Sequence, residues 1–162
     1  MRNGRSNFSQ KSSSLGGDVE PESGIKGPAA SKGSREGGQT VADKKKILVV
    51  DDSFTSLMMN QGALGDYNVV LARNGREGIR QAVTEKPDLI LMDVNMPGMD
   101  GFQACRWLRA FEATKTVPII IMTTRNDPQS VKVAFANGCN GYLVKPFKEE
   151  DLLSAVRKHL GE

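Results

Sequence analysis

Cysteine, histidine and aromatic residues are scarce in this chain of 162 residues. It contains two cysteines, Cys105 and Cys139, one histidine and 6% aromatic residues. Two cysteines without a CxxC pair do not form the disulfide framework of a small secreted domain, and they do not match a structural zinc site. We therefore expect both thiols to stay reduced and to fill small buried positions.

Long apolar runs are also missing. No run approaches the roughly 18 residues that a membrane-spanning helix needs, and the N-terminus lacks the continuous apolar segment of a signal peptide. These absences predict a soluble cytoplasmic protein without a membrane partner.

The part of the chain with apolar runs has no excess of basic residues. Residues 1–46 carry nine Lys and Arg against five Asp and Glu, whereas residues 47–162 carry thirteen against fourteen. A domain that binds nucleic acid usually has a basic face on its folded unit. Direct nucleic-acid binding is therefore not expected.

The N-terminal segment is rich in small polar residues. Residues 1–46 hold eight Gly and eight Ser, too little apolar surface to offset the entropy of ordering a backbone. This composition predicts a disordered, basic Gly/Ser-rich tail over residues 1–44 and one folded domain over residues 45–162. The lysines at 44–46 either contact an acidic partner or only keep one end of a strand in water.

From Ile47 onward the apolar pattern alternates between strands and helices. Strands are predicted at 47–50, 69–72, 89–92, 117–122 and 141–144, and helices at 54–64, 75–85, 101–111, 128–137 and 149–160. Continuous apolar strands joined by helices are typical of a parallel sheet that is covered on both faces. The fold class is therefore α/β, with a doubly wound, five-stranded parallel sheet.

Caps and periodic apolar residues place the helices. Asn74 and Glu77 match a capping box, and Asp127 with the following proline matches another helix start. Helical spacing predicts two inward faces, Ile79, Ala82 and Val83 on one helix and Ala104, Leu108 and Phe111 on the next. Met58 and Met59 fit either the core or a partner surface.

Polar side chains stand where four of the predicted strands end. They are Asp51, Asp52, Asp93, Thr123 and Lys145. In open α/β sheets the carboxyl ends of the strands carry the chemistry. Converging carboxylates raise one another's pKa unless a cation is present, and Mg²⁺ prefers such oxygen ligands. The lysine and the hydroxyl then remain to meet an anion, which indicates phosphoryl chemistry on an aspartate.

Four motifs carry a family resemblance. They are ILVVDDS at 47–53, LILMDVNMPGMDG at 89–101, IIIMTT at 119–124 and GYLVKPF at 141–147. Together they resemble the receiver domain of bacterial two-component response regulators, the CheY-like family, in its stand-alone form. The resemblance implies the strand order 2-1-3-4-5.

The resemblance also implies roles for the residues at the strand ends. Asp93 would be the phosphoacceptor, and Lys145 and Thr123 would contact the phosphoryl group. Mg²⁺ would be held by Asp51, Asp52, Asp93 and the backbone carbonyl of Asn95. It further implies a cis Lys145–Pro146 bond, a switch role for Tyr142, and an influence of Asn95 and Arg125 on the lifetime of the acyl phosphate.

The function implied is that of a phosphorelay switch without an output enzyme domain. A histidine kinase or phosphotransfer protein would donate the phosphoryl group. Because the sequence ends at Glu162, output is expected through a protein target at the fourth helix, fifth strand and fifth helix, around residues 127–160. The protein would be either a chemotaxis- or motility-type effector or a relay intermediate.

Two other functions are alternatives to the switch. An aspartyl-phosphate hydrolase of the haloacid dehalogenase type needs an acid two positions after its nucleophile, but position 53 is Ser. A receiver fold that acts as a scaffold without being phosphorylated is the other alternative. Each polar strand end, taken alone, would also fit a solvated turn.

Overall fold

Five runs of branched apolar residues form a parallel sheet in the computed structural model, which describes residues 43–162. The strands are β1 (Lys46–Val50), β2 (Asn68–Ala72), β3 (Leu89–Asp93), β4 (Ile119–Thr123) and β5 (Gly141–Val144). Their order is β2-β1-β3-β4-β5, as predicted, with Val50 paired to both Ala72 and Met92. Except for Lys46, the residues of β1, β3 and β4 are all buried, which explains their continuous apolar sequences.

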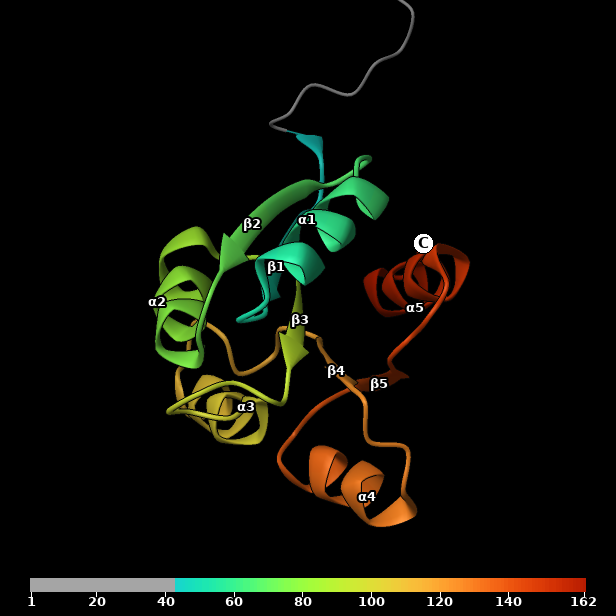
Figure 1. The fold of residues 1–162 in the computed structure, drawn as a ribbon. Helices are drawn as coiled ribbons and strands as arrows, with labels where there is room; N and C mark the ends of the chain where they lie inside the picture. Colours follow the sequence, from blue (N-terminus) through green and yellow to red (C-terminus); the bar gives the residue numbers. More distant parts are fainter. Residues whose placement is uncertain (1–42) are drawn as a thin grey trace, which may run out of the picture. The chain divides into compact units, whose positions relative to one another are not determined.

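Helices cover both faces of this sheet (Figure 1). They are α1 (Phe54–Ala63), α2 (Gly75–Glu85), α3 (Gly101–Ala110), α4 (Pro128–Ala136) and α5 (Glu149–Leu160). Leu57 of α1 and Val156 of α5 belong to one apolar layer. Residues of α2, α3 and α4, among them Leu108, belong to the other. The predicted doubly wound architecture is therefore confirmed.

The predicted tail, residues 1–44, lies outside the described residues apart from its last two positions. Within residues 43–162, no helix combines the length and apolarity required to cross a membrane. Cys105 and Cys139 are free and buried. Burial raises the pKa of the Cys139 thiol to about 12, so this group stays neutral inside the apolar layer beneath α2, α3 and α4.

The structure differs from the prediction at the start of one helix and of one strand. Asn74 caps α2 by accepting the Glu77 N–H, but the Glu77 carboxylate accepts from the N–H of Arg73 instead of Asn74. The reciprocal capping box occurs at α3, between Asp100 and Gln103. The fourth strand starts at Ile119 instead of position 117, because Pro118 has no N–H to donate to a ladder.

The predicted inward faces are correct except at their last members, Val83 and Phe111, which are exposed. Phe111 follows the end of α3 in an extended backbone conformation, so the helical spacing no longer applies to it. The buried stripe of α2 runs through Gly75, Gly78 and Ala82, which leaves Val83 to one side. At Gly78 a Cβ would lie 2.8 Å from the Val50 Cγ2 atom, so the close approach of α2 to β1 requires glycine.

The side chain of Arg109 ties the end of α3 to two loops. Its guanidinium donates to the carbonyl oxygens of Gly138 at 2.9 Å, Val117 at 2.7 Å and Thr114 at 3.2 Å. It also donates to the Asn140 side-chain oxygen at 2.6 Å. One side chain thus satisfies four acceptors from the segments that precede β4 and β5.

Replacing Arg109 by alanine is expected to lower the free energy of unfolding by about 2–4 kcal/mol, because several partly buried acceptors lose their donor at once. Urea denaturation measures the change. Arg106→Ala is the matched control, since Arg106 is an exposed arginine of the same helix and its loss should cost no more than about 0.5 kcal/mol. Equal losses in both variants would contradict this role of Arg109.

Candidate functional site

Four strands deliver polar side chains to one edge of the sheet. Asp93 and Thr123 are the last residues of β3 and β4, while Asp51 directly follows β1 and Lys145 directly follows β5. Parallel strands end at the same edge, and the register holds them level, since Asp93 pairs with Met122. The structure therefore brings together the residues that the sequence predicted to converge.

Three carboxylates form the centre of the site. Asp51 and Asp93 are 1% and 5% exposed, whereas Asp52 is exposed to solvent. One oxygen from each carboxylate lies within 4.8 Å of the others. The N–H of Ser53 donates to the Asp51 Oδ1 atom at 2.9 Å, which fixes the orientation of the most buried carboxylate.

Lys145 bridges the two buried carboxylates. Its Nζ donates to the Asp51 Oδ2 atom at 2.8 Å and to the Asp93 Oδ1 atom at 3.2 Å. The Lys145–Pro146 bond is cis. The backbone N–H of Lys145 also donates to the Thr123 carbonyl oxygen at 2.7 Å, which extends the pairing of β4 and β5 to the site.

The charges of these groups are unbalanced. Burial raises the pKa of Asp93; Lys145 opposes this shift, and the charges of Asp51 and Asp52 add to it. Burial lowers the pKa of Lys145, but its hydrogen bond to Asp51 and the charges of Asp93 and Asp51 raise that pKa above its ordinary value. The site thus holds three carboxylates and one ammonium, which contacts two of them, and this donor set suits a divalent cation.

The loop after β3 runs close to Asp93. Asn95, in this loop, is exposed, and its backbone carbonyl oxygen accepts no hydrogen bond from the residues at 43–162. Gly101 begins α3, where a Cβ would overlap the carbonyl oxygen of Asp93. Glycine at 101 therefore lets α3 start directly against the end of β3. The sequence contained this residue in a motif but gave no sign of the contact.

Thr123 and Tyr142 are linked through the backbone of Arg125. The Thr123 hydroxyl is buried and accepts the Arg125 N–H at 3.2 Å. The Tyr142 hydroxyl donates to the Arg125 carbonyl oxygen at 2.7 Å. The family resemblance implied that Arg125 lies near the site, but it did not predict that the main chain of Arg125 would join these two hydroxyls.

An exposed apolar patch lies beside the site on α1. It consists of Phe54, Met58 and Met59, and Met59 is 70% exposed. A neighbouring cavity of about 370 Å³ is lined by Met59 together with Lys145, Pro146 and Phe147. Met58 and Met59 were predicted to lie either in the core or on a partner surface, and their exposure excludes the core. Exposed apolar side chains that are grouped in this way mark contact surfaces.

Comparison with known proteins identifies related chains. Residues 47–157 match the response regulator receiver domain family. Protein PilH of Pseudomonas aeruginosa is 40% identical over 113 residues, which cover 68% of this chain and 93% of PilH. The transcriptional regulatory protein PhoP of Bacillus subtilis is 35% identical over 70% of this chain, but the match spans only 47% of PhoP.

Solved structures show the same architecture. Chemotaxis protein CheY4 of Vibrio cholerae has a TM-score of 0.69 and 38% identity, over 71% of this chain and 98% of CheY4. The receiver domain of sensor histidine kinase PA1611 from Pseudomonas aeruginosa also has a TM-score of 0.69, with 32% identity over 74% of this chain and 99% of that one. That structure holds a magnesium ion in its active-site cleft.

Proposed function

The chain belongs to the response regulator receiver domain family, and we propose that residues 45–162 are a receiver switched by Mg²⁺-dependent phosphorylation of Asp93. Membership supports a role in two-component signalling, and the relatives PilH and CheY4 are similar over nearly their whole lengths. The observation that carries the proposal is the buried pair Asp51 and Asp93, bridged by Lys145 and joined by Asp52.

Each residue of the site has a chemical role in this proposal. Asp51, Asp52, Asp93 and the Asn95 carbonyl oxygen would hold Mg²⁺, which supplies positive charge against the carboxylates and an incoming phosphoryl group. Lys145 places a second positive charge where that group would stand. The Thr123 hydroxyl turns from the Arg125 N–H to donate to a phosphoryl oxygen.

The transfer itself needs a donor and a positioned acceptor. A carboxylate oxygen of Asp93 bonds to phosphorus while the bond from phosphorus to the donor's histidine nitrogen breaks, and the electron pair stays on that nitrogen. The donor would be a histidine kinase or phosphotransfer protein of the cytoplasm. The α1 patch of Phe54, Met58 and Met59 offers it an apolar contact surface beside Asp93.

The hydrogen bonds from Thr123 through the backbone of Arg125 to Tyr142 would carry the effect of phosphorylation to the target-binding surface. When the Thr123 hydroxyl leaves the Arg125 N–H, the segment that also holds the Tyr142 hydroxyl loses a contact. Tyr142 lies on β5, so the change reaches the surface formed by α4, β5 and α5, where a target protein would bind. The phosphoryl group thus supplies the differential interaction that a population shift requires.

Intact-mass analysis after incubation with Mg²⁺ and acetyl phosphate tests this function. The native protein is expected to gain one phosphoryl group. The gain should be absent with EDTA and in Asp93→Asn, where an amide replaces the nucleophilic carboxylate. The contrary result would be no mass gain in the native protein. If a cognate histidine kinase failed to phosphorylate it as well, the receiver would be a scaffold and the proposed switch would be wrong.

A further inference from the structure

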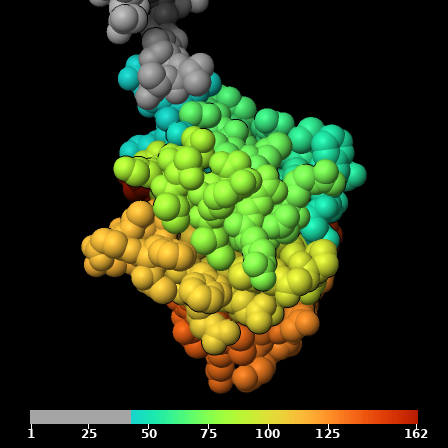
Figure 2. All heavy atoms as spheres, turned by 90° about the vertical axis from the view of Figure 1, so that its left-hand side faces the viewer, coloured from blue at the N-terminus to red at the C-terminus, as the bar shows by residue number. Residues whose placement is uncertain are grey.

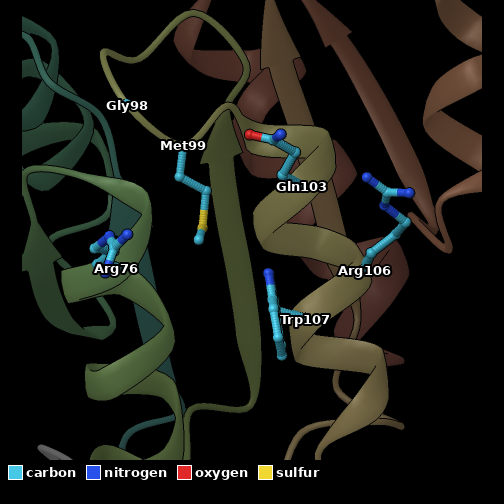
Figure 3. A pocket seen from close by; sticks show the side chains of 6 residues that line it. All are labelled: Arg76, Gly98, Met99, Gln103, Arg106 and Trp107. Atoms are coloured by element: carbon cyan, nitrogen blue, oxygen red, sulfur yellow. The ribbon is translucent and has the colours of Figure 1, made fainter.

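A second recessed surface lies between α2 and α3, outside the carboxylate site (Figure 3). This α2–α3 groove has a volume of about 540 Å³ and is lined by Arg76, Gly98, Met99, Gln103, Arg106 and Trp107. In Figure 3, Met99 and Trp107 lie between Arg76 on α2 and Arg106 on α3. None of these side chains has a role in the phosphoryl chemistry proposed above.

The two arginines of the groove carry charge that the described part of the chain does not neutralise. Neither Arg76 nor Arg106 has a carboxylate oxygen within 4.0 Å among residues 43–162. The nearest acids along the chain have other partners: Glu77 accepts the Arg73 N–H, Asp100 accepts the Gln103 N–H, and Glu112 pairs with Lys115. A guanidinium group without a carboxylate partner is free to make bidentate contacts with the carboxylates of another molecule.

The groove also continues into exposed aromatic surface. Trp107 is 55% exposed and stacks on Phe111, which is 41% exposed, with 6.4 Å between ring centroids. Positions 103, 106, 107 and 110 follow the helical spacing of one exposed stripe on α3, and the exposed Phe111 comes directly after the helix end. Figure 2 shows this side of the molecule, with α2 in light green above α3 in yellow. Tryptophan and arginine are the residue types most enriched at binding hot spots.

We propose that the α2–α3 groove binds an acidic amphipathic segment of a partner protein. Its apolar side chains would pack on Trp107, Phe111 and Met99, and its carboxylates would pair with Arg76 and Arg106. This mode, an amphipathic segment laid in a groove, needs both kinds of contact along one line. The proposal does not depend on phosphorylation of Asp93.

Charge favours an acidic partner segment over three other occupants of the groove: the N-terminal segment of this chain, a second copy of the protein, and a nucleic acid. The segment 1–46 as a whole is basic, with nine Lys and Arg against five Asp and Glu. Its one acidic stretch, residues 18–22, has Val19 as its single branched apolar side chain and no aromatic one, so it does not supply the apolar contacts that Trp107 and Phe111 call for. A second copy related by twofold symmetry would present the same patch and oppose arginine with arginine. Residues 47–162 carry no net positive charge, which disfavours a nucleic acid as the partner.

A peptide selection tests the groove directly. A random-peptide library is bound to the immobilised full-length protein and, in parallel, to the variant Arg76→Glu/Arg106→Glu. Enriched peptides are expected to combine Glu or Asp with Leu, Phe or Trp and to be lost on the variant. Enrichment of basic or uncharged peptides, or of the same peptides on both proteins, would overturn the proposal.

Affinity is then measured by the fluorescence of Trp107, the only tryptophan of the chain. Binding of a selected peptide should weaken at least about tenfold in Arg76→Glu/Arg106→Glu and with rising salt. Lys132→Glu is the matched control, since Lys132 is an exposed cation on α4, and its affinity should equal that of the native protein. Tighter binding of a single-stranded oligonucleotide than of the peptide would also overturn the proposal.

Two further measurements separate this proposal from the phosphorylation switch. Asp93→Asn should bind the peptide as the native protein does, because the groove does not use the carboxylate. The double arginine variant should gain the same phosphoryl mass as the native protein, which shows that it is folded. Loss of peptide binding in Asp93→Asn would contradict the independence of the two sites.

Discussion

Replacing Lys145 by methionine is expected to lower the free energy of unfolding by about 3 kcal/mol near neutral pH, because two buried carboxylates lose their shared cation. The Lys145 Nζ atom lies 2.8 Å from Asp51 and 3.2 Å from Asp93, and both acids are buried. Methionine keeps the apolar stem and removes only the charge. The same change should slow phosphorylation of Asp93 by about two orders of magnitude or more, the effect of losing a charge-stabilising donor.

Urea denaturation and the rate of mass gain with acetyl phosphate measure the two effects. Lys158→Met is the matched control, because Lys158 is an exposed lysine on α5; its stability should change by at most about 0.5 kcal/mol and its rate should be unchanged. Addition of Mg²⁺ should restore part of the stability of Lys145→Met, since a divalent cation replaces the missing charge. A variant as stable and as reactive as the native protein would refute this assignment.

Replacing Asp93 by asparagine is expected to stabilise the metal-free protein at neutral pH, by on the order of 1 kcal/mol. Burial is the main cause of the raised pKa of Asp93, so the native state holds this proton more tightly than the unfolded chain does. As the pH rises from the unfolded value of 3.8 through the raised native value, this group therefore lowers the free energy of unfolding. At a pH above both pKa values the loss of unfolding free energy is constant, and the uncharged amide of Asp93→Asn removes this loss.

With Mg²⁺ bound, the native protein should become more stable than Asp93→Asn. The ion binds the ionised carboxylates, so its stabilising effect grows as the pH rises through the same interval and reaches about 2.7 kcal/mol at a hundredfold excess over the dissociation constant. Thermal unfolding from pH 4 to pH 7, with EDTA or with MgCl₂, should show this in the native protein and a much smaller effect in Asp93→Asn. Asp66→Asn, at an exposed position, should behave as the native protein does. Equal stabilisation of native protein and Asp93→Asn by Mg²⁺ would place the ion elsewhere.

The sequence predicted the sheet and the convergence of the site because both depend on strands alone. Runs such as 47–50 and 89–92 are apolar without alternation, so they belong inside a covered parallel sheet. Once the strands are parallel, Asp51, Asp93 and Lys145 must reach one edge. Whether each of these residues has the role implied by the family resemblance stays a prediction, which the mass and stability measurements test.

Other features depend on tertiary contacts that no local pattern encodes. Apolarity predicted that Phe111 points inward, but the helix ends before it and the ring stacks on Trp107 instead. Gly78 has no apolar side chain to reveal that it faces the core, although it determines how closely α2 approaches β1. The hydrogen bond from the Tyr142 hydroxyl to the Arg125 carbonyl oxygen joins residues 17 positions apart. Because the acceptor is a backbone atom, the identity of the side chain at 125 does not predict this contact.

Because β5 lies at the end of the strand order, we expect amides at the site to exchange hydrogen at two different rates. β1, β3 and β4 each have a neighbouring strand on both sides, whereas β5 pairs only with β4. Amides in the central strands, which carry the carboxylates and Thr123, should exchange through global unfolding, and those of β5 through local opening at lower free energy. Tyr142 on β5 and Lys145, the residue after β5, thus lie at a strand that should open more easily than β1 and β3, which hold the acids.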